Sequence, residues 1–562
     1  MSLRKGMALG CGACLAGALG FWFQDTLIQE HNDIVHSSVE VESRKLFSSF
    51  LSKKFRDIDA CWHVLSNYSG THTINPRCLR VPASVNAVER LLREAQKNNL
   101  KIRPVGRYLS PNGLASSDGM LSLALCDKIL HVDKKRKQVT VEPGVIIEDI
   151  LKALKSYNMT LANFSSIKEQ QIAGWTQVGA HGTGAQLPTV DEMVVHMKIA
   201  TPNLGTLELS RDTTSVVDSE IFRLARCGLG SIGVITEMTL QCTDYHWLRE
   251  TISTMPIGNL HVDHTRRLQN YRHLRYMWIP YTGDVVIVKS NPTYDYIPDA
   301  EEDNNMALKK LASLYRENLH KFEANAKEKI ESLTFSQLRD RLLDLDPLET
   351  DYVKKINKAE LFFWQNKCRY RSGPSDEILG FDCGGQQLVL EVAFPTGTFN
   401  CPTGDDLKFA MELKELLEKS GIPAPAPIEQ RWTCASSSYL SPAFNNNPNM
   451  VYSWIGIIMY LPPNQDESGR ERIRTQFNRY ADILYKLSKK YGAVPHWAKI
   501  EVPTLDSDDR SKIIDLKSLI ENRYNVGKFQ NAMRLFDPKG ILSNRLIKRL
   551  VGDIVNNDIN NL

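Results

Sequence analysis

The apolar residues of the chain recur at spacings that alternate between helix and strand from about residue 80 onward. The first predicted helix spans residues 85–98, where four apolar residues share one face: Val88, Leu91, Leu92 and Ala95. Two further helices are predicted over residues 147–157 and 219–225. Short apolar runs predict strands over residues 121–125, 129–133, 138–141, 193–200 and 205–209. Such a mixture is typical of an α+β domain, which we expect to end near Gln241.

The pattern changes after residue 250, where longer apolar runs appear between charged segments. These runs predict strands over residues 285–288, 388–394 and 454–460. Amphipathic helices are predicted over residues 306–329, 405–420 and 471–491. The first of these carries an apolar stripe, which is far more often core than part of a cofactor site: Leu308, Leu311, Leu314 and Tyr315. The second half therefore predicts a separate α+β domain with helices packed on a sheet.

The N-terminus carries an uncharged stretch over residues 6–23, preceded by Arg4 and Lys5. Its 18 residues are just long enough for a bilayer, which needs roughly 17–25. A cleaved signal peptide and a targeting segment are alternative interpretations. We favour a retained membrane segment within residues 1–30, with the basic residues on the inner side. Residues 31–70 are polar and predict a helical or extended connector.

Length, net charge and cysteine content exclude several classes of protein. A chain of 562 residues is too long for one core, so two or more domains are expected. A net charge of +4, from 69 basic and 65 acidic residues, argues against a nucleic-acid binder. Eleven scattered cysteines do not form a secreted disulfide framework. Cys11 and Cys14 form a lone C-x-x-C pair in apolar surroundings, so no metal site is expected there.

A glycine-rich segment reads G-A-H-G-T-G over residues 179–184. Such a backbone can approach a ligand closely and point its N–H groups at an anion. The spacing is not the G-x-G-x-x-G of a Rossmann fold, and the Lys-Ser/Thr of a P-loop is missing. On this segment alone, a surface turn with no ligand is an equally good interpretation.

The residues around this segment resemble a known family of flavoproteins. Upstream, residues 101–113 read K-I-R-P-V-G-R-Y-L-S-P-N-G, and downstream, residues 225–240 read A-R-C-G-L-G-S-I-G-V-I-T-E-M-T-L. In this order they resemble the FAD-binding domain of vanillyl-alcohol oxidase type, which the aldonolactone oxidoreductases share. The resemblance implies an α+β protein with a two-subdomain FAD-binding domain over residues 71–245. It further implies an α+β cap domain over residues 246–490 and a C-terminal segment, residues 491–562, that returns to the flavin.

Four later motifs resemble the mitochondrial dehydrogenase branch of this family, which completes ascorbate synthesis in plants and algae. Residues 376–387 read D-E-I-L-G-F-D-C-G-G-Q-Q, and residues 424–432 read A-P-A-P-I-E-Q-R-W. Residues 496–501 read H-W-A-K-I-E, and residues 536–544 read F-D-P-K-G-I-L-S-N. The similarity covers roughly residues 60–550 in the right order.

The resemblance implies FAD as cofactor, because a lactone C–H cannot be oxidised without a hydride acceptor and no side chain can be one. The backbone and side chains expected to hold FAD come from four stretches of the chain. They are Gly106, Arg107, Tyr108, Leu109, Ser110 and Asn112; Ser165, Ser166, Gln171 and Gly174; Gly179, Ala180, His181, Gly182, Thr183 and Gly184; and Val234 with Ile235 at the adenine end.

Glu429 and Arg431 stand at i and i+2, so on a strand both side chains emerge from the same face. Spacing alone favours an ordinary exposed ion pair, but the resemblance places this pair at the lactone. Arginine can stabilise negative charge on reduced flavin, and glutamate can hold or deprotonate a hydroxyl. His496 and Lys499 are a second catalytic pair implied near the flavin ring, although a lone histidine is more often structural.

Several residues depart from the family pattern. Leu109 stands where some members have a histidine that bonds covalently to flavin, so FAD is expected to be non-covalent. Arg107 and Tyr108 replace a Ser-Gly pair, and a left-handed Tyr108 would cost on the order of 1–2 kcal/mol. Ser165 replaces an alanine, which favours a dehydrogenase over an oxidase. Cys383 matches a cysteine near the active site and is a candidate redox-sensitive residue.

The resemblance therefore predicts an FAD enzyme of the inner mitochondrial membrane that oxidises L-galactono-1,4-lactone to ascorbate. Its electron acceptor would be cytochrome c. The alternative is an assembly partner of respiratory complex I with impaired or lost FAD binding, which Arg107 and Tyr108 suit. The two roles are compatible. A weaker third possibility is an oxidase that makes peroxide.

Overall fold

The computed structural model describes residues 57–60, 64–294, 304–321, 333–367, 370–380, 385–425, 427–462, 465–500 and 510–552. The predictions for residues 6–23 and for Cys383 lie outside these ranges, as does most of the predicted connector. Within these ranges, no helix is both long enough and apolar enough to cross a membrane.

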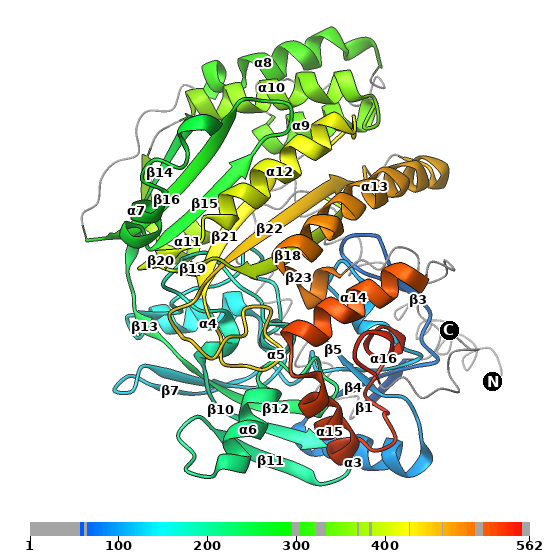
Figure 1. The fold of residues 1–562 in the computed structure, drawn as a ribbon. Helices are drawn as coiled ribbons and strands as arrows, with labels where there is room; N and C mark the ends of the chain where they lie inside the picture. Colours follow the sequence, from blue (N-terminus) through cyan, green and yellow to red (C-terminus); the bar gives the residue numbers. More distant parts are fainter. Residues whose placement is uncertain are drawn as a thin grey trace, which may run out of the picture.

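Two sheets build the first half of the protein, in the lower part of Figure 1. The smaller has the order β1-β4-β6-β5, with β1 antiparallel to β4 and the other pairs parallel. Its strands are β1 (Asp57–Ala60), β4 (Cys78–Pro82), β5 (Arg103–Val105) and β6 (Gly119–Ser122). The larger is antiparallel, with the order β11-β10-β12-β8-β7. Its strands are β7 (Ile129–Asp133), β8 (Gln138–Val141), β10 (Val194–Thr201), β11 (Gly205–Ser210) and β12 (Val234–Gln241).

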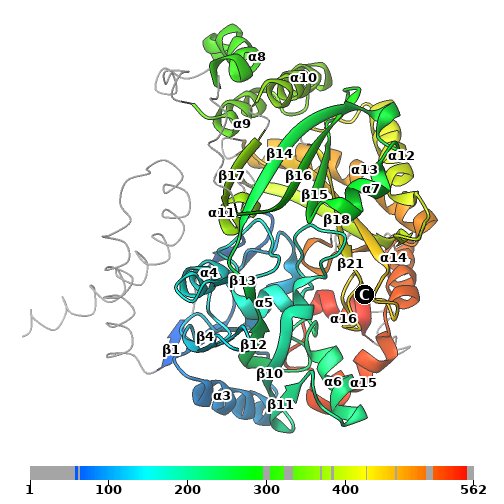
Figure 2. The same cartoon turned by 90° about the vertical axis from the view of Figure 1, so that its left-hand side faces the viewer.

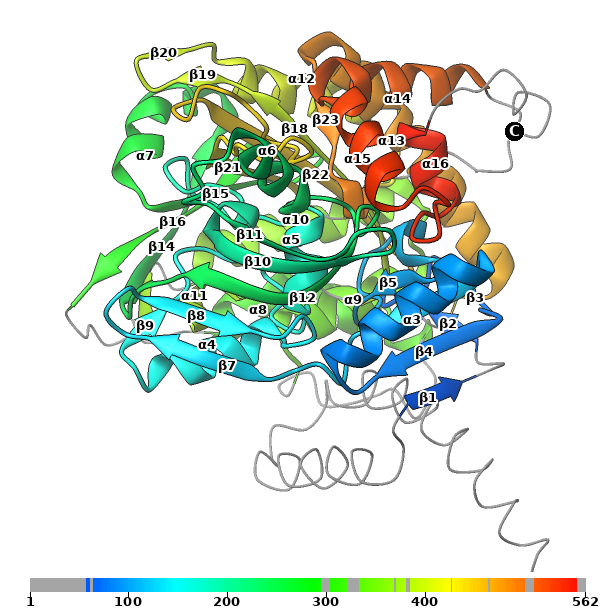
Figure 3. The ribbon, with the colours of Figure 1, turned by 90° about the horizontal axis from the view of Figure 1, so that it is seen from below.

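Helix α3 (Val85–Asn98) connects β4 to β5 within the smaller sheet and packs against both sheets. Ser84 caps its first turn by accepting a hydrogen bond from the Ala87 N–H, and Asn99 ends it in the left-handed conformation. Its buried face, with Val88 and Leu92, packs in one cluster with residues of β6 and β10. Figure 3 shows α3 beside β4 on one side of the domain and β10 and β11 on the other.

Three more helices cover the larger sheet: α4 (Ile147–Lys155), α5 (Ile172–Gln177) and α6 (Val216–Ala225). They share one apolar cluster with β8, β10 and β12. Short two-stranded pairs complete the connections. These are β2 (Leu65–Ser66) with β3 (Thr73–Ile74), β9 (Met159–Thr160) with β13 (Thr243–Asp244), and β19 (Gly397–Thr398) with β20 (Cys401–Pro402).

An eight-stranded antiparallel sheet forms the centre of the second half, with the order β17-β14-β16-β15-β21-β22-β18-β23. Its strands are β14 (Trp247–Pro256), β15 (His273–Trp278), β16 (Asp284–Thr293), β17 (Tyr370–Pro374), β18 (Gln387–Pro395), β21 (Ile428–Cys434), β22 (Val451–Tyr460) and β23 (Val494–Pro495). The associated helices are α7 (His264–Asn270), α8 (Asn304–Glu317), α9 (Phe335–Leu345), α10 (Thr350–Asn366), α11 (Ser375–Leu379), α12 (Asp405–Lys419) and α13 (Glu467–Tyr491).

The two faces of this sheet have different partners. Tyr276 and Trp278 point to the face covered by α12 and α13. Met277, between them, points to the other face, where α10 contributes Leu361 and Trp364. Figure 2 shows α8, α9 and α10 at one end of the molecule. The part of this second face formed by β21, β22 and β18 is turned toward the first domain, because Arg431 of β21 reaches the cavity described below.

The C-terminal helices α14 (Arg510–Arg523), α15 (Val526–Phe536) and α16 (Arg545–Val551) return to the first domain (Figure 1). The Ile102 N–H donates to the Ile541 carbonyl at 2.9 Å, beside β5. Asn544 donates to three carbonyls of residues 113–116 at 2.8–3.1 Å. The C-terminal segment thus holds the loop that follows β5.

The predicted α+β class is confirmed: a first domain of two sheets with helices is followed by a second domain in which helices pack on one large sheet. Residues 121–125 were predicted as a strand, but β6 ends at Ser122 because the Leu123 carbonyl accepts the Cys126 N–H in a turn. The helix predicted over residues 306–329 is shorter, since α8 ends at Glu317 and a 3-10 turn follows at Leu319–Lys321.

Candidate active site

A cavity of about 210 Å³ lies between the two subdomains and the cap. Its walls are the loop after β5, the segment leading through α5, and the start of β12. One end is closed by residues of the cap and the C-terminal segment: Arg431, His496, Ala498 and Lys499. Many sequence-predicted residues line it: Gly106, Arg107, Tyr108, Leu109, Ser110, Ser165, Ser166, Gln171, Gly174, Ala180, His181, Val234 and Ile235.

Tyr108 lies on the cavity wall with a φ of 59°, the left-handed conformation that glycine adopts without strain. Its hydroxyl group lies 2.6 Å from Ser116 Oγ, and burial raises the pKa of the phenol. The ring is therefore held at the side of the cavity by a hydrogen bond. The chain accommodates a left-handed tyrosine here, at a cost on the order of 1–2 kcal/mol.

The α5 wall leaves room for a ligand. A Cβ added to Gly174 would meet no atom within 4 Å, although Gly174 lies in the middle of a helix that packs on the core. Gln171 donates to the Gly144 carbonyl at 3.0 Å, while its Oε1 has no hydrogen-bond partner among the residues that the structure describes. Open space beside a glycine and an unsatisfied buried amide oxygen are what a polar cofactor would fill.

Ser165 and Trp175 are joined across the same wall. The indole Nε1 of Trp175 donates to Ser165 Oγ at 2.9 Å, and Ser165 Oγ donates to Gln170 Oε1 at 2.6 Å. Trp175 is buried, so its indole N–H holds the serine hydroxyl in place.

The glycine-rich segment contributes to the cavity only through Ala180 and His181. Gly182 packs against Asn163, and the Thr183 hydroxyl donates to the Leu274 carbonyl of the cap. Gly184 has a φ of 145° and packs against the Arg272 carbonyl, where a Cβ would lie at 2.3 Å. This segment therefore joins the two domains more than it lines the cavity.

Two other residues predicted to hold FAD also stand behind the wall. Gly179 has a φ of 62° and packs against Pro442. Asn112 is buried and donates to the Trp497 and Ile500 carbonyls at 2.8 and 3.1 Å. Asn112 thereby ties the loop after β5 to the segment that carries His496 and Lys499.

Glu429 and Arg431 lie on β21 with their side chains on the same face, as the spacing predicted. Arg431 Nη2 lies 3.1 Å from Glu429 Oε2 and 3.0 Å from Glu391 Oε1. Arg275, on the neighbouring strand β15, pairs with Glu429 Oε1 at 3.3 Å. The closed end of the cavity is thus a network of charges rather than a single ion pair.

Sequence reasoning missed Glu391, the buried carboxylate of β18, and also Arg275. Glu391 is 1% exposed, and its Oε2 accepts a hydrogen bond from Lys499 Nζ at 2.7 Å. His181 Nε2 lies 3.1 Å from the same oxygen. The signal that would have found it is a glutamate inside an otherwise apolar strand, because a buried charge needs a partner.

Burial and the charges of neighbouring groups determine the protonation states of these side chains. Burial would raise the pKa of Glu391, but Lys499, His181 and Arg431 together hold it well below its usual range. Burial likewise opposes ionisation of Glu429, yet Arg431 and Arg275 keep its pKa below the ordinary value. Burial lowers the pKa of His181, and burial with Lys499 lowers that of His496 well below its usual range. Two carboxylates therefore face three cations beside two neutral imidazoles.

Aromatic stacking fixes the histidine closest to this network. The ring of His181 stacks on Trp454 with centroids 3.7 Å apart and planes 19° apart. The ring of His496 lies tilted to both, at 5.9 and 6.0 Å. The Trp454 indole donates to Thr433 Oγ1 at 2.9 Å, so its plane is fixed as well.

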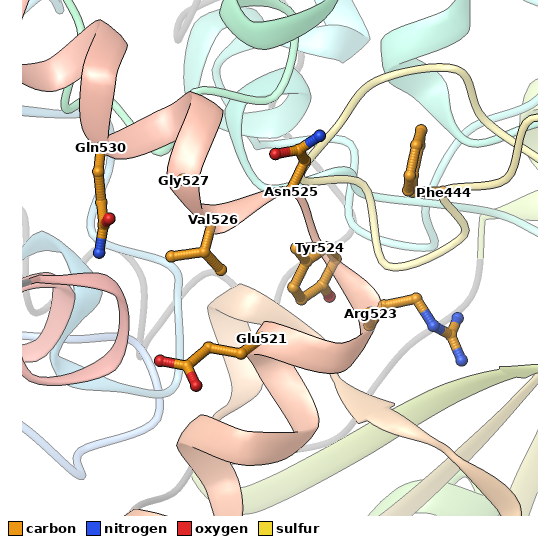
Figure 4. A pocket seen from close by; sticks show the side chains of 8 residues that line it. All are labelled: Phe444, Glu521, Arg523, Tyr524, Asn525, Val526, Gly527 and Gln530. Atoms are coloured by element: carbon orange, nitrogen blue, oxygen red, sulfur yellow. The ribbon is translucent and has the colours of Figure 1, made fainter.

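A second hollow lies on the surface where α14 turns into α15, lined by Arg523, Tyr524 and Asn525 among others (Figure 4). It is wide open, and Arg523 is already bonded to the Pro442 and Gly492 carbonyls at 3.3 and 2.6 Å. None of the sequence-predicted site residues lines it. The cavity between the two subdomains and the cap is therefore the candidate active site.

Two family models match the chain across both domains. Residues 76–210 match the model described as FAD binding domain, and residues 238–550 match D-arabinono-1,4-lactone oxidase. The chain belongs to the D-arabinono-1,4-lactone oxidase family. It is accordingly a flavin oxidoreductase of the aldonolactone type, and its cofactor is FAD.

Curated relatives agree with this assignment. The chain is 44% identical to the mitochondrial L-galactono-1,4-lactone dehydrogenase of Arabidopsis thaliana, over 87% of this chain and 81% of that protein. It is equally similar, at 44%, to L-galactono-1,4-lactone dehydrogenase 1 of Oryza sativa subsp. japonica, over 87% and 84%. L-gulonolactone oxidase of Mus musculus is 27% identical, over 77% and 88%.

Among solved structures, cholesterol oxidase from Brevibacterium sterolicum is similar in fold, with a TM-score of 0.66. At 15% identity it covers 88% of this chain and 97% of the oxidase. This chain thus shares its fold with an enzyme named for a sterol substrate, so the fold alone does not define the substrate.

Proposed function

We propose that the protein oxidises L-galactono-1,4-lactone to L-ascorbate and passes the electrons to cytochrome c. FAD, when bound in the cavity, supplies the acceptor for the hydride from C2 of the lactone. The observation that carries the proposal is a pair of cations, Arg431 and Lys499, at one end of that cavity, with the carboxylates of Glu429 and Glu391 paired to them behind the wall. The relatives of 44% identity that bear this name support the choice of substrate.

In this proposal Arg431 and Lys499 bind the oxygen atoms of the lactone, since both side chains reach the cavity. Their positive charges also favour the negative charge that develops in the transition state. Glu429 is ionised and stands just behind Arg431, its partner on the cavity wall; in this proposal it accepts the hydroxyl proton once the lactone is bound. His496 is neutral, so it takes part as a hydrogen-bonding group rather than as a fixed charge.

The stoichiometry of the reaction determines how many electrons the acceptor must take. The lactone loses two electrons and two protons, one proton with the hydride and one from the hydroxyl group. The 2-keto-lactone then rearranges to the ascorbate enediol. Cytochrome c takes one electron at a time, so two molecules are reduced per lactone. Attachment of FAD is proposed to be non-covalent, because Leu109 has no nucleophilic atom.

The test begins with the absorbance spectrum of purified protein, recorded before and after anaerobic addition of L-galactono-1,4-lactone. We expect flavin bands that bleach on addition, and reduction of two equivalents of cytochrome c per lactone in air. Release of the flavin by mild acid would show that it is not covalently bound. An Arg431→Met variant that keeps its flavin is expected to lose turnover by at least a hundredfold, because the lactone and the developing charge lose their partner.

Two results would contradict the proposal. Flavin-loaded protein that leaves cytochrome c oxidised with this lactone is not the proposed dehydrogenase. Oxygen uptake with peroxide release would instead identify an oxidase. D-arabinono-1,4-lactone and L-gulono-1,4-lactone, assayed in parallel, show which ring configuration is preferred.

Localisation at the inner mitochondrial membrane, through residues 6–23, belongs to the same proposal. The names of the plant relatives support the mitochondrion. The assembly role at respiratory complex I was motivated by Arg107 and Tyr108, and the structure gives Tyr108 a place on the wall of the cavity. We therefore propose the enzymatic role first. Co-migration with complex I in a mild native gel tests the second.

A further inference from the structure

Glu391 binds to three separate parts of the chain with one carboxylate. Its Oε1 accepts a hydrogen bond from Nη2 of Arg431, in the cap, at 3.0 Å. Its Oε2 accepts a hydrogen bond from Nζ of Lys499, in the C-terminal segment, at 2.7 Å. The same oxygen lies 3.1 Å from Nε2 of His181, in the FAD-binding domain. All three partners line the cavity, whereas Glu391 itself does not. It stands behind the cavity wall, and its carboxylate contacts the side chains of Arg431, Lys499 and His181.

The sheet provides the space for this carboxylate. Gly456 of β22 lies directly opposite both Glu391 of β18 and Glu429 of β21 in the strand register. A Cβ on Gly456 would lie 3.7 Å from Glu391 Oε1, so only a very small side chain fits there. The two glutamates flank this glycine, and Arg431 Nη2 bridges them.

The backbone of Glu391 also orients the segment that carries Lys499. Its carbonyl accepts the His496 N–H at 2.9 Å, and the Lys499 N–H donates to the His496 carbonyl at 2.9 Å. His496 Nδ1 accepts the Ala498 N–H at 3.1 Å. One residue thus fixes both the start of this turn and the ammonium group at its end.

We propose that Glu391 is the positioning residue of the active site: it aligns Arg431 and Lys499 toward the reacting end of the cavity and sets the net charge around the flavin. This inference rests on the proposed function for its lactone-dependent part only. An amide at this position would turn an NH₂ group toward donors, so the two cations would lose a common acceptor. It would also remove one negative charge beside the flavin site.

The charge effect has a definite sign. Reduced flavin gains negative charge, and a wall with one negative charge fewer stabilises it. We therefore expect Glu391→Gln to raise the two-electron potential of the bound flavin. A tenfold shift in the two-electron equilibrium corresponds to about 30 mV, which sets the scale of the expected change. A purely structural carboxylate far from the flavin would leave this potential unchanged.

Glu250→Gln is the matched control. Glu250 lies on β14 of the same sheet, is also buried, and pairs with Arg371 at 2.8 Å at the edge remote from the cavity. Both variants lose one buried charge of an ion pair. We expect Glu391→Gln to raise the potential and lower kcat/KM for the lactone at least tenfold, and Glu250→Gln to change neither more than twofold.

Two further variants complete the experiment. Glu391→Asp keeps the charge, so it is expected to retain the potential while losing alignment and kcat/KM. Glu391→Gln is expected to have a smaller effect on kcat/KM in a Lys499→Gln background, because residues that act as a unit are not additive. Where Glu391→Gln folds poorly, Glu391→Asp tests the inference, because a positioning carboxylate is expected to give a lower kcat/KM at an unchanged potential.

The outcomes separate this inference from the proposed function. A folded Glu391→Gln variant with the potential and kcat/KM of Glu250→Gln would overturn the inference. The inference would also be overturned if the effects of Glu391→Gln and Lys499→Gln on kcat/KM were fully additive and Glu391→Gln left the flavin potential unshifted. A wild-type protein inactive with the lactone would overturn the proposed function, yet the potential of Glu391→Gln, measured by dye equilibration without lactone, would still decide whether Glu391 tunes the site.

Discussion

Tyr108 and Gly174 shape the cavity wall in opposite ways. Tyr108 occupies a backbone conformation suited to glycine and anchors its ring on Ser116. Gly174 occupies a helical position suited to alanine and leaves the space beside it open. A glycine in a helix costs roughly 0.5–1 kcal/mol relative to alanine. The open space beside Gly174 is the kind of benefit that offsets such a cost at a binding site.

Gly174→Ala is therefore expected to change stability and cofactor binding in opposite directions. The apoprotein is expected to gain about 0.5–1 kcal/mol in unfolding free energy. FAD binding is expected to weaken by about tenfold or more, because overpacking costs about 1–3 kcal/mol. Denaturant unfolding and flavin titration measure the two effects.

Gly527→Ala is the control for this prediction. Gly527 also lies in a helix, α15, and an added Cβ would meet nothing within 4 Å. It is expected to show the gain in stability without any change in FAD affinity. Equal FAD affinities for both variants would mean that the cofactor does not approach Gly174.

The residues of the site were predictable where the signal was local. Glu429 and Arg431 are two positions apart on a strand, so their shared face follows from strand geometry. Glu391 and Arg275 gave no such signal, because their partners lie on other strands and segments. The register that pairs Arg275 with Arg431 is a property of the assembled sheet. Sequence spacing within one element cannot show it.

At the scale of elements, helices with a strong apolar stripe were predicted to within a few residues. α3 spans the predicted residues because Ser84 and Asn99 cap it on both sides. α8 ends earlier than predicted, at Glu317, and a 3-10 turn follows. The prediction was too long because the apolar spacing continues beyond the residue at which the helix ends. The order of strands in the eight-stranded sheet was beyond prediction, because β21, β22 and β18 pair across long loops.

Helix α16 offers a test of how the C-terminal segment supports the cavity. Asn544 caps this helix by accepting the Ile547 N–H at 3.0 Å, and its NH₂ group donates to carbonyls of residues 113–116. Asn544→Asp keeps the cap but removes the donor. We expect a loss of about 1–3 kcal/mol in unfolding free energy and weaker FAD binding, because Ser116 holds Tyr108.

Asn525→Asp is the matched control at another helix N-cap, where the side chain accepts the Lys528 N–H at 3.3 Å. It is expected to stay within about 0.5 kcal/mol of the wild type. Asn544→Ala, which loses the cap as well, is expected to lose about 1 kcal/mol more than Asn544→Asp. Wild-type stability in Asn544→Asp would show that these hydrogen bonds do not support the loop.

At the scale of the whole molecule, the junction between the domains is polar and buried. His273 Nδ1 lies 2.8 Å from the Thr183 carbonyl of the glycine-rich segment. Burial lowers the pKa of His273 to about 3, with Arg272 and His246 nearby acting in the same direction. The imidazole therefore stays neutral in the folded protein and joins the cap to the FAD-binding domain without a charge.

This junction is expected to make the protein sensitive to acid. The folded pKa of His273 lies below the unfolded value of about 6.5, so its contribution to stability is complete above that pH. Below it, each pH unit removes about 1.4 kcal/mol of unfolding free energy until the pH approaches 3. Urea unfolding at pH 7.5 and 5.5 measures the slope.

His273→Asn retains a donor for the Thr183 carbonyl but has no titrating group. It is expected to show a shallower loss of stability between pH 7.5 and 5.5 than the wild type, by about 1.4 kcal/mol. The exposed His131→Asn variant is the control and should follow the wild type. Identical slopes for all three proteins would show that His273 is not the group responsible.

The position of Glu391 also bears on when the protein becomes active during its synthesis. Its partners stand 210 residues before it, at His181, and 108 residues after it, at Lys499. Contacts between such distant positions form late, because the loops between them must close first. A nascent chain that ends before the C-terminal segment lacks Lys499 and holds the Glu391 carboxylate without one of its cations. The C-terminal helices also share the apolar clusters of the FAD-binding domain, so neither this domain nor the reaction centre is complete before the last residues of the chain are in place.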